Sequence, residues 1–198
     1  MKLVIATKNK NKISEIRDIM RTISGLEILS IADFGDIPDV VEDGTTFREN
    51  AQKKAAATAK YTGLAALSDD SGLMIDALHG EPGVFSARYG GTGLTDADRN
   101  LLVLKKMENI PNDKRTARFI CVIAIAMPNG TIHYAEGNCE GLIIHEQRGT
   151  EGFGYDPIFL LPYKNKTMAE LTLAEKNTIS HRARALAKAS EILATIGA

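Results

Sequence analysis

A short apolar run that leads into two adjacent carboxylates limits the folds open to this chain more than any other segment. The run is Leu64–Leu67, and Asp69 and Asp70 follow it closely. Its length predicts a buried strand that ends at Ser68, and Gly72 permits a sharp exit from that strand. Because such a strand delivers acidic side chains to a site, the segment predicts a sheet with chemistry at the end of one strand.

The two carboxylates are expected to play different roles. Neighbouring side chains on an extended segment point to opposite faces, so Asp69 and Asp70 do not share one environment. One of them can bind Mg²⁺ or activate a water molecule while the other braces the turn, because Mg²⁺ takes one or two carboxylates together with phosphate oxygens. The alternative interpretation is an Asx-type turn capped by aspartate and serine side chains.

Length and composition indicate a globular protein with a small ligand. The chain has 198 residues, enough for one sizeable domain or two small lobes with a hydrophobic core. No linker or repeat divides the sequence, and 44% of the residues are hydrophobic, which argues against disorder. The net charge of −1 argues against binding a nucleic-acid duplex through a broad basic surface. A small phosphorylated ligand remains compatible with this charge.

The cysteines and the lengths of the apolar runs favour a cytoplasmic location. Cys121 and Cys139 stand in strand-like sequence without the spacing of paired metal ligands, so we expect buried thiols rather than a zinc site or a disulfide. Such thiols suit a reducing compartment. The sequence shows no export signal and no run long enough to span a membrane, so no contact with a membrane is expected.

The N-terminal segment combines a strand, a polar loop and the start of a helix. Residues 2–6 predict the strand, and the apolar spacing of residues 13–23 predicts the helix. Asn9 or Asn11 caps this helix and Gly25 ends it. Backbone N–H groups and the dipole at a helix start can bind phosphate. The loop lacks the glycines of a Walker A sequence, and a capped helix with solvated lysines is the alternative. This candidate phosphate cradle consists of Thr7, Lys8, Asn9, Lys10, Asn11 and Lys12.

A second helix follows an acidic loop that carries another candidate metal ligand. Thr46 and Glu49 have the spacing of a capping box, which predicts a helix through about Tyr61. Glu42 precedes this helix and can bind Mg²⁺ together with an acid of the strand. Lys53, near the middle of the helix, is a candidate phosphate contact. Solvated surface charges are the alternative interpretation for both Glu42 and Lys53.

The middle of the sequence predicts a mixed sheet. A long β run at 117–127 is followed by Asn129 and Gly130, a dipeptide typical of hairpins. Residues 131–135 are then expected to pair back, and residues 142–145 to continue the sheet edge. Alternating helices and strands with a late hairpin favour a mixed α/β fold.

Two clusters in the last third of the chain suit recognition of a flat base. Phe153 and Tyr155 lie on a glycine-framed turn, Gly152–Pro157, where an aromatic ring can stack on a base while a carboxylate binds its edge. A plain structural turn is the alternative. Basic residues at the start of a long amphipathic helix oppose its dipole, which is unfavourable unless an anion or an electron-rich ligand lies nearby. These basic residues are Lys176, His181 and Arg182.

Six motifs occur in a fixed order along nearly the whole chain. They are Thr7-x-Asn9-x-x-Lys12, Thr46-Phe47-x-Glu49-Asn50-Ala51, Asp69–Leu73, Pro82-Gly83 with Ser86–Tyr89, Gly152–Pro157 and Ser180-His181-Arg182. Together and in this order they resemble the inosine/xanthosine triphosphate pyrophosphatases, a family that removes deaminated purine nucleotides from the nucleotide pool. One departure is Asn11, where many relatives carry glycine; asparagine tolerates left-handed geometry, so little consequence is expected.

The resemblance implies an elongated mixed α/β fold with flanking helices and two lobes around a nucleotide cleft, in a single domain over residues 1–198. It also implies a homodimer and Mg²⁺-dependent cleavage of a nucleoside triphosphate to the monophosphate and pyrophosphate. Asp70 would be the catalytic acid-base and a metal ligand, with Glu42 as the second ligand. The implied substrate contacts are Thr7, Lys8, Asn9, Lys10, Asn11, Lys12, Lys53, Ser71, Phe153, Gly154, Tyr155, Asp156, Lys176, His181 and Arg182.

Hydrogen-bond polarity at the purine edge predicts the base preference. Cationic donors from Lys176, His181 or Arg182 suit the 6-oxo acceptor of hypoxanthine or xanthine and mismatch the 6-amino donor of adenine. Two alternatives stay open: a related pyrophosphatase that prefers modified pyrimidines, and a noncatalytic nucleotide- or RNA-binding module. The purine-pocket motifs disfavour the first. Glu42 and Asp70 argue against the second, because a pure binder gains little from carboxylates beside phosphates.

Overall fold

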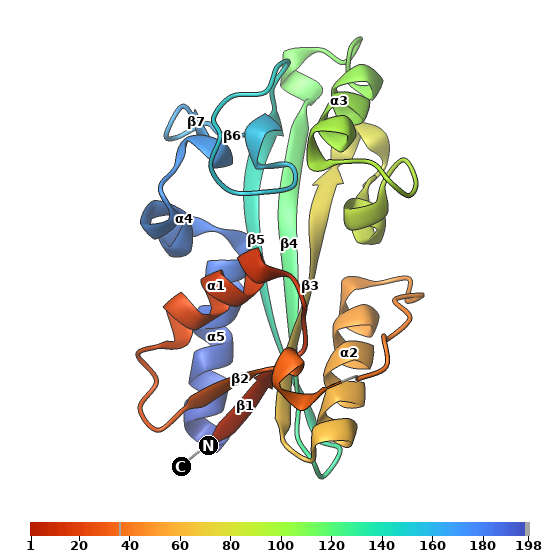
Figure 1. Ribbon diagram of the computed structural model, residues 1–198. Helices are drawn as coiled ribbons and strands as arrows, with labels where there is room; N and C mark the ends of the chain where they lie inside the picture. The colour runs from red at the N-terminus through yellow and green to blue at the C-terminus, as the bar shows by residue number, and fades with distance from the viewer. Residues whose placement is uncertain (36, 197–198) are drawn as a thin grey trace. The chain divides into compact units, whose positions relative to one another are not determined.

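The computed structural model describes residues 1–35 and 37–196 of the chain (Figure 1). The chain divides into two compact units. Unit 1 consists of Met1–Asp70, Cys121–Gly137 and Arg182–Ala198, and unit 2 consists of Ser71–Ile120 and Asn138–His181. The nucleotide cleft and the single domain implied by the resemblance stay predictions.

The strands form a mixed sheet, which confirms the predicted fold class. They are β1 (Lys2–Ile5), β2 (Glu27–Ser30), β3 (Ala65–Ile75), β4 (Thr116–Ala126), β5 (Ile132–Ile143), β6 (Phe159–Leu161) and β7 (Lys166–Thr167). Their hydrogen-bonded order is β2-β1-β3-β4-β5-β6-β7 (Figure 1). β1 pairs in parallel with β2 and β3, whereas β6 pairs antiparallel with β5 and β7.

The α-helices flank these strands. They are α1 (Lys10–Met20), α2 (Phe47–Thr62), α3 (Asp96–Lys106), α4 (Leu173–Ile179) and α5 (His181–Ile196). Within the described part of the chain, none of the helices combines the length and the apolar character needed to cross a membrane.

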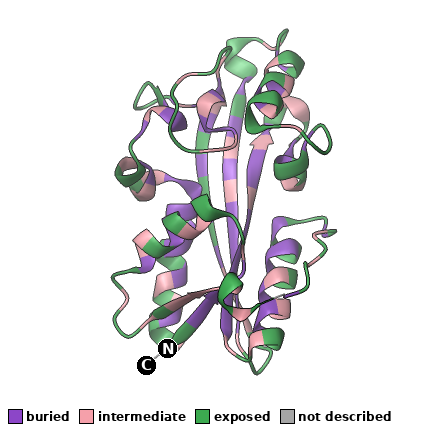
Figure 2. Cartoon of the chain, in the orientation of Figure 1, coloured by how far each residue is buried: buried purple, intermediate pink, exposed green. Residues whose placement is uncertain are grey.

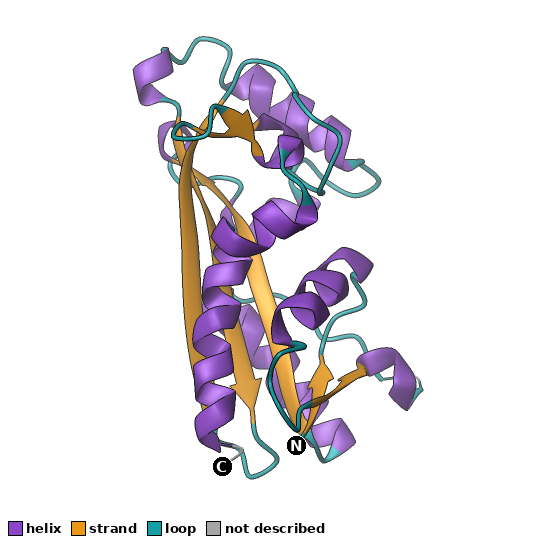
Figure 3. Ribbon diagram, turned by 90° about the vertical axis from the view of Figure 1, so that its left-hand side faces the viewer, coloured by secondary structure: helices purple, strands orange, loops and turns teal. Residues whose placement is uncertain are grey.

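In unit 1, alternate residues of the strands pack against different helices. One face of the strands forms a core with α1 and α5, whose members include Leu3, Ile5, Leu67, Cys121, Ile16 and Leu186. Val4 and Ala66 point to the other face, because successive strand residues alternate, and both are fully buried. α2 lies on that second side of the strands of unit 1 (Figure 1), and its buried residues include Phe47, Ala51 and Ala55. Helices α1 and α5 lie in front of the strands in the view of Figure 3.

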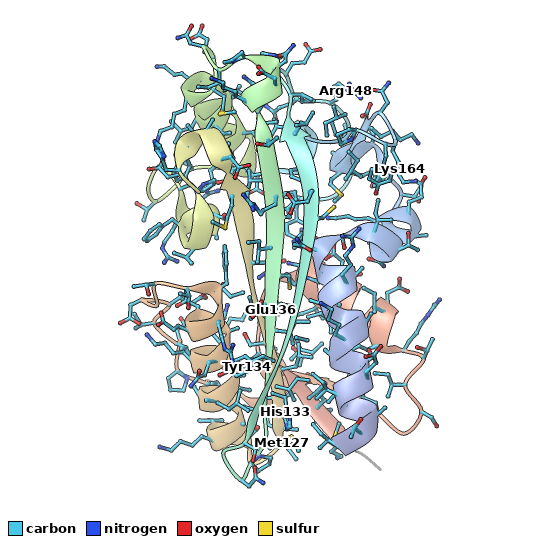
Figure 4. All side chains as sticks on the ribbon, turned by 180° about the vertical axis from the view of Figure 1, so that it is seen from behind. Met127, His133, Tyr134, Glu136, Arg148 and Lys164 are labelled. Carbon is cyan, nitrogen blue, oxygen red and sulfur yellow. The ribbon has the colours of Figure 1, made fainter. Side chains whose placement is uncertain are left out.

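A tyrosine of β5 makes two contacts with α2. The Tyr134 hydroxyl donates a hydrogen bond to Gln52 Oε1 at 2.6 Å, and the Arg48 guanidinium lies 3.8 Å from the centre of the Tyr134 ring (Figure 4). At its N-terminus, α2 has the predicted capping box between Thr46 and Glu49. The contacts of Tyr134 add to the packing of the buried residues of α2, whose stripe also contains the position of Lys54.

Strand β3 is longer than the sequence predicts. It continues from Ala65 to Ile75 instead of ending at Ser68, and Gly72 lies inside it, so the predicted sharp exit was wrong. Asp69 and Asp70 are 1% and 7% exposed and each contacts a cationic side chain. Because these cations compensate the buried charges, the strand can continue through both carboxylates.

The first helix is shorter than predicted. α1 ends at Met20 and not at Gly25. The Ile23 N–H donates to the Met20 carbonyl oxygen at 3.1 Å, which closes a tighter turn than an α-helical one. The apolar spacing therefore continues past the end of the helix itself.

The two segments predicted after the hairpin belong to one strand. Residues 131–135 and 142–145 are joined by the continuous β5, which ends at Ile143. Gly141 made this strand hard to recognise, because it weakens the apolar pattern. A Cβ atom at Gly141 would lie 2.5 Å from the Leu160 carbonyl oxygen, so close packing against β6 requires glycine.

In unit 2, the segments of the long strands that belong to this unit form a second core with α3. Leu73 of β3, Phe119 of β4 and Phe159 of β6 are buried together with Val103 and Met107, at and just beyond the end of α3. Buried residues follow the strands and the inner faces of the helices (Figure 2). This core holds α3 firmly in unit 2.

Both cysteines are buried free thiols, as predicted. Burial raises the pKa of the Cys121 thiol to about 12, so it stays protonated at neutral pH. A protonated, buried thiol is a poor nucleophile and metal ligand, so Cys121 acts as an apolar core residue.

Candidate active site

The predicted phosphate cradle is the capped start of α1. Asn9 is the N-cap residue, and its Oδ1 accepts hydrogen bonds from the N–H groups of Asn11 and Lys12 at 3.0 and 3.3 Å. The Thr7 hydroxyl accepts from the Asn9 N–H at 3.2 Å. The helix cap is therefore present. Because it lies at a helix N-terminus, the same loop is also a favourable place for an anion.

The three lysines of this loop have different surroundings. Lys8 forms an exposed ion pair with Asp39, with 2.7 Å between Lys8 Nζ and Asp39 Oδ1. Lys10 lines a surface groove along α1. Lys12 points inward, and its Nζ lies 2.9 Å from Asp69 Oδ2. Lys12 is therefore the lysine of the loop that lies next to the carboxylates of β3.

Asp69 lies on the α1 and α5 side of the strand, among buried charges. Its Oδ2 contacts Lys12 and also Arg182, whose Nη2 is 3.0 Å away. Arg182 Nη1 lies 2.5 Å from Glu15 Oε2, and the Arg182 side chain is only 2% exposed. Lys12 and Glu15 come from α1 and Arg182 from α5, so the network ties both helices to β3.

This network holds Asp69 in its charged form. Burial by itself would raise the pKa of Asp69, but the charges of Lys12 and Arg182 outweigh it and hold the pKa well below its usual range. Burial opposes the charge of Arg182 as well, and Asp69 and Glu15 nevertheless raise the pKa of its guanidinium. Asp69 is therefore a poor proton acceptor and a strong electrostatic anchor.

Asp70 lies on the opposite side of the strand, toward α2, as the alternation of side chains predicts. Lys54 Nζ lies 3.3 Å from Asp70 Oδ1 and 3.0 Å from Glu42 Oε2. The same ammonium donates to the Asp69 carbonyl oxygen at 2.9 Å. Asp70 Oδ2 is buried and accepts no hydrogen bond of ordinary geometry within residues 1–35 and 37–196. The Asn50 side chain nevertheless interacts with the Asp70 carboxylate and lowers its pKa. This oxygen is available to accept a hydrogen bond from water or to bind a cation.

The surroundings of Asp70 favour proton transfer. Burial raises the pKa of Asp70 above its ordinary value against the opposing charges of Lys54 and Lys12, and the Glu42 carboxylate raises it further. Burial lowers the pKa of Lys54, but the neighbouring carboxylates outweigh it and raise that pKa. A carboxylate with a raised pKa beside a charged lysine is typical of a general base.

The carboxylates present fit a magnesium ion. Glu42 and Asp70 contact one ammonium, and Asp70 presents a buried oxygen that accepts no ordinary hydrogen bond among the described residues. Within the same residues there is no group of three or more histidine, cysteine, aspartate or glutamate side chains that could hold a metal by itself. Because Mg²⁺ binds one or two carboxylates and completes its shell with water and phosphate oxygens, this pair is sufficient together with a triphosphate.

Lys53 on α2 stays a predicted phosphate contact, while its neighbour Lys54, which was not predicted, lies beside the carboxylates. Lys53 Nζ lies 2.5 Å from Asp43 Oδ1 in a pair whose side chains are 43% and 69% exposed. Lys54 is 13% exposed on its side chain. A signal for Lys54 was present in the sequence: it follows Phe47 by two helical turns, and Phe47 begins the buried stripe of α2.

In unit 2, the predicted base-binding turn carries a buried ion pair. Lys176 Nζ lies 2.7 Å from Asp156 Oδ2, and both side chains are less than 5% exposed. The same ammonium is 4.6 Å from the centre of the Phe153 ring. Asp156 Oδ2 also accepts the Phe153 N–H at 2.9 Å. The structure therefore brings Phe153, Asp156 and Lys176 together. Lys176 lies in the last turn of the short helix α4 and not at the start of the long helix α5, so the predicted opposition between Lys176 and a helix dipole was wrong.

The other predicted residues of unit 2 come from the turn, from β3 and from the start of α5. The Tyr155 hydroxyl donates to the Ser86 carbonyl oxygen at 2.8 Å and is buried. The His181 ring stacks on Phe119 with 4.7 Å between ring centres. Ser71 is half-buried and follows Asp70 directly on β3. Tyr155 and His181 thus pack into the core beside the turn.

Comparison with known proteins identifies the family. The model of the Ham1 family matches residues 3–192. The chain belongs to the Ham1 family. It is 53% identical over 193 residues to the dITP/XTP pyrophosphatase of Desulforamulus reducens, covering 98% of this chain and 96% of that protein. It is 50% identical over 186 residues to the dITP/XTP pyrophosphatase of Geobacter sulfurreducens, covering 94% and 93% of the two chains.

A solved structure of the family has the same fold. The HAM1 protein of Coxiella burnetii is 45% identical, covers 98% of both chains and superposes with a TM-score of 0.90. The family implied by the motifs is therefore confirmed.

Proposed function

We propose that this chain hydrolyses deaminated purine nucleoside triphosphates, such as ITP, dITP and XTP, to the monophosphate and pyrophosphate. The names of the Ham1-family relatives support this substrate class. The observation that carries the proposal is Asp70: a buried carboxylate with an oxygen that accepts no ordinary hydrogen bond among the described residues, next to Lys54 and Glu42.

The cations of unit 1 are assigned to the triphosphate. Lys12 and Lys54 are held inward by Asp69 and Asp70, so their positions are fixed before substrate binds. Lys8, Lys10 and Lys53 are exposed and would add long-range attraction for a phosphate chain. The polar groups of Thr7, Asn9 and Asn11 at the start of α1 would donate hydrogen bonds to phosphate oxygens.

Asp70 would orient and deprotonate the attacking water through Oδ2. Mg²⁺ bound to Glu42 and Asp70 would neutralise phosphate charge. Lys54 would stabilise the negative charge that develops on departing pyrophosphate, since it remains protonated beside the carboxylates. No covalent intermediate with the protein is needed, because water attacks directly.

The purine would be recognised by unit 2. The Phe153 ring offers a stacking surface, and Lys176 is a buried cationic donor suited to a 6-oxo group. Adenine presents a 6-amino donor at that position, so its binding would leave buried donors facing each other. His181 and Arg182 stay candidate base contacts. Arg182 would have to contact the base while it keeps its ion pairs with Asp69 and Glu15.

A panel of nucleoside triphosphates, each with and without Mg²⁺, tests the proposal. Pyrophosphate and orthophosphate are measured separately. We expect ITP, dITP and XTP to release pyrophosphate much faster than ATP or GTP, and only with the metal. Equal turnover of ATP and ITP, or orthophosphate as the first product, would contradict the proposal.

The same panel separates the alternatives. A pyrophosphatase with another base preference would cleave a modified pyrimidine triphosphate faster than ITP. A noncatalytic nucleotide- or RNA-binding module would bind these ligands without turnover. We further propose that the enzyme works as a homodimer in the cytoplasm and binds neither nucleic acid nor membranes.

A further inference from the structure

Helix α3 holds the base-binding turn by both backbone polar groups of one residue. Asp96 Oδ2 accepts the hydrogen bond of the Gly154 N–H at 2.8 Å. Asn100 Nδ2 donates to the Gly154 carbonyl oxygen at 3.1 Å. Asp96 and Asn100 are one helical turn apart, so they lie on the same face of α3. We refer to these two contacts as the Gly154 clamp.

The clamped residue controls the neighbouring base-binding side chains. Gly154 lies between Phe153 and Tyr155 and has a φ of 63°, a left-handed conformation that glycine adopts without strain. Phe153 is also fixed at its N–H by Asp156, and Tyr155 at its hydroxyl by the Ser86 carbonyl. Without the clamp, the peptide units on either side of Gly154 could rotate and move the Phe153 ring relative to Lys176.

The clamp is anchored in the core of unit 2. Asn100 is 1% exposed, and its Nδ2 also lies 3.3 Å from Gln147 Oε1. Asp96 is exposed, so a change there does not create a cavity. Neither residue belongs to the six motifs that carry the family resemblance, and neither is among the substrate contacts that the resemblance implies.

We propose that Asp96 and Asn100 are positioning residues that set base selectivity through Gly154. The inference rests on the proposed function, because it takes the turn to be the purine site. Selectivity between ITP and ATP requires the stacked base to present its 6-position accurately to a buried donor. A loosened turn would weaken that alignment. The kcat/KM for ITP would fall more than that for ATP, because only ITP has the 6-oxo group that the aligned donor contacts.

The test compares three variants of the first turn of α3 with the wild type. Asp96→Ala removes the acceptor, whereas Asp96→Asn keeps an oxygen that can accept the Gly154 N–H. Asp98→Ala is the matched control: Asp98 also lies in the first turn and accepts from the Thr95 N–H at 2.8 Å in a capping box. The Asp98→Ala substitution therefore weakens the N-terminal cap of α3 and leaves both contacts of the Gly154 clamp in place.

We expect Asp96→Ala to lower the ratio of kcat/KM for ITP to that for ATP by about tenfold, mainly through KM for ITP. Asp96→Asn should retain most of the wild-type ratio of kcat/KM for ITP to kcat/KM for ATP. Asp98→Ala should lower the melting temperature and leave the ratio unchanged. Asn100→Asp, which loses the amide donor at nearly constant volume, should lower the ratio if it folds.

A binding measurement gives a second readout. The chain contains no tryptophan, so Phe153→Trp creates a single fluorescent reporter on the turn. Inosine monophosphate should quench this reporter by stacking, and Asp96→Ala in the same background should weaken that binding by a similar factor.

The outcomes distinguish the two levels of the proposal. A wild-type enzyme that does not prefer ITP over ATP would overturn the proposed function and the inference with it. If the wild type prefers ITP, but Asp96→Ala slows both substrates equally or leaves both unchanged, the clamp has no role in selectivity and the inference fails.

Discussion

The prediction that most directly tests the charge network concerns Asp69. Asp69→Asn keeps the size of the side chain and removes the buried charge that faces Lys12 and Arg182. Removing one partner of a buried ion pair typically costs about 3–5 kcal/mol, because the opposite charge remains buried without compensation.

The surroundings of Asp69 indicate that the loss in the free energy of unfolding lies at the low end of that range. Arg182 keeps Glu15 at 2.5 Å, so its guanidinium is still paired after the substitution. Lys12 is 15% exposed on its side chain and can turn toward water. We therefore expect a loss of about 3 kcal/mol in the free energy of unfolding. For a chain of this length that corresponds to a drop of about 6–12 °C in the melting temperature.

Urea and thermal unfolding, followed by far-ultraviolet circular dichroism, measure this loss. The control is Asp39→Asn, which removes a carboxylate from the exposed pair with Lys8 and should leave stability unchanged, because exposed pairs contribute little. If Asp69→Asn unfolds within about 1 kcal/mol of this control, the buried network does not stabilise unit 1 as argued.

The pH dependence gives a second test of the same charge. The folded-state pKa of Asp69 lies below its unfolded value of 3.8, so its stabilising contribution is fully present above that value. The contribution is lost as pH falls through the lower, folded-state pKa. The difference in stability between wild type and Asp69→Asn should therefore be constant between about pH 5 and 8 and should narrow below about pH 4. A difference that grows on acidification would refute the assignment.

Four further predictions concern catalysis and assembly. Lys54→Met should lower the turnover of ITP by about a hundredfold or more, whereas Lys53→Met should leave it nearly unchanged; steady-state kinetics of the two variants would expose a wrong choice of lysine. Asp70→Asn should slow single-turnover cleavage of ITP by about a hundredfold to ten-thousandfold while ITP binding persists, and near wild-type turnover would exclude Asp70 as the base. Removal of divalent metal by a chelator should abolish pyrophosphate release, with recovery on adding Mg²⁺; activity that survives chelation would contradict the metal role. Light scattering should return about twice the monomer mass of 21.4 kDa, and a monomer at assay concentration would reject the homodimer.

Local patterns predicted much of the secondary structure. Helix caps depend on a few neighbouring residues, so Asn9 and Thr46 each cap a helix as the sequence indicates. The alternation of strand side chains likewise predicted that Asp69 and Asp70 face different environments. Both inferences succeed because they use only the fixed geometry of one helix turn or one strand.

Contacts between distant segments explain what the sequence could not provide. Arg182 was expected beside a base, and its ion pairs with Asp69 and Glu15 could not be anticipated because they join segments at opposite ends of the chain. Lys53 and Lys54 are neighbours, and which of them points inward depends on the rotation of α2 against the sheet. The continuation of β3 past Ser68 likewise depends on cations that come from α1, α2 and α5.

The two adjacent acids show how one strand can serve both stability and chemistry. A carboxylate that is paired with two cations and has a lowered pKa holds its partners in place but accepts protons poorly; this describes Asp69. A carboxylate with a raised pKa and an oxygen that accepts no ordinary hydrogen bond among the described residues can act as a base; this describes Asp70. Lys54 contacts both, through the Asp69 carbonyl and the Asp70 carboxylate. The anchored backbone at Asp69 therefore fixes the reactive group that follows it, and the rigid position of Asp70 is a consequence of the charge next to it.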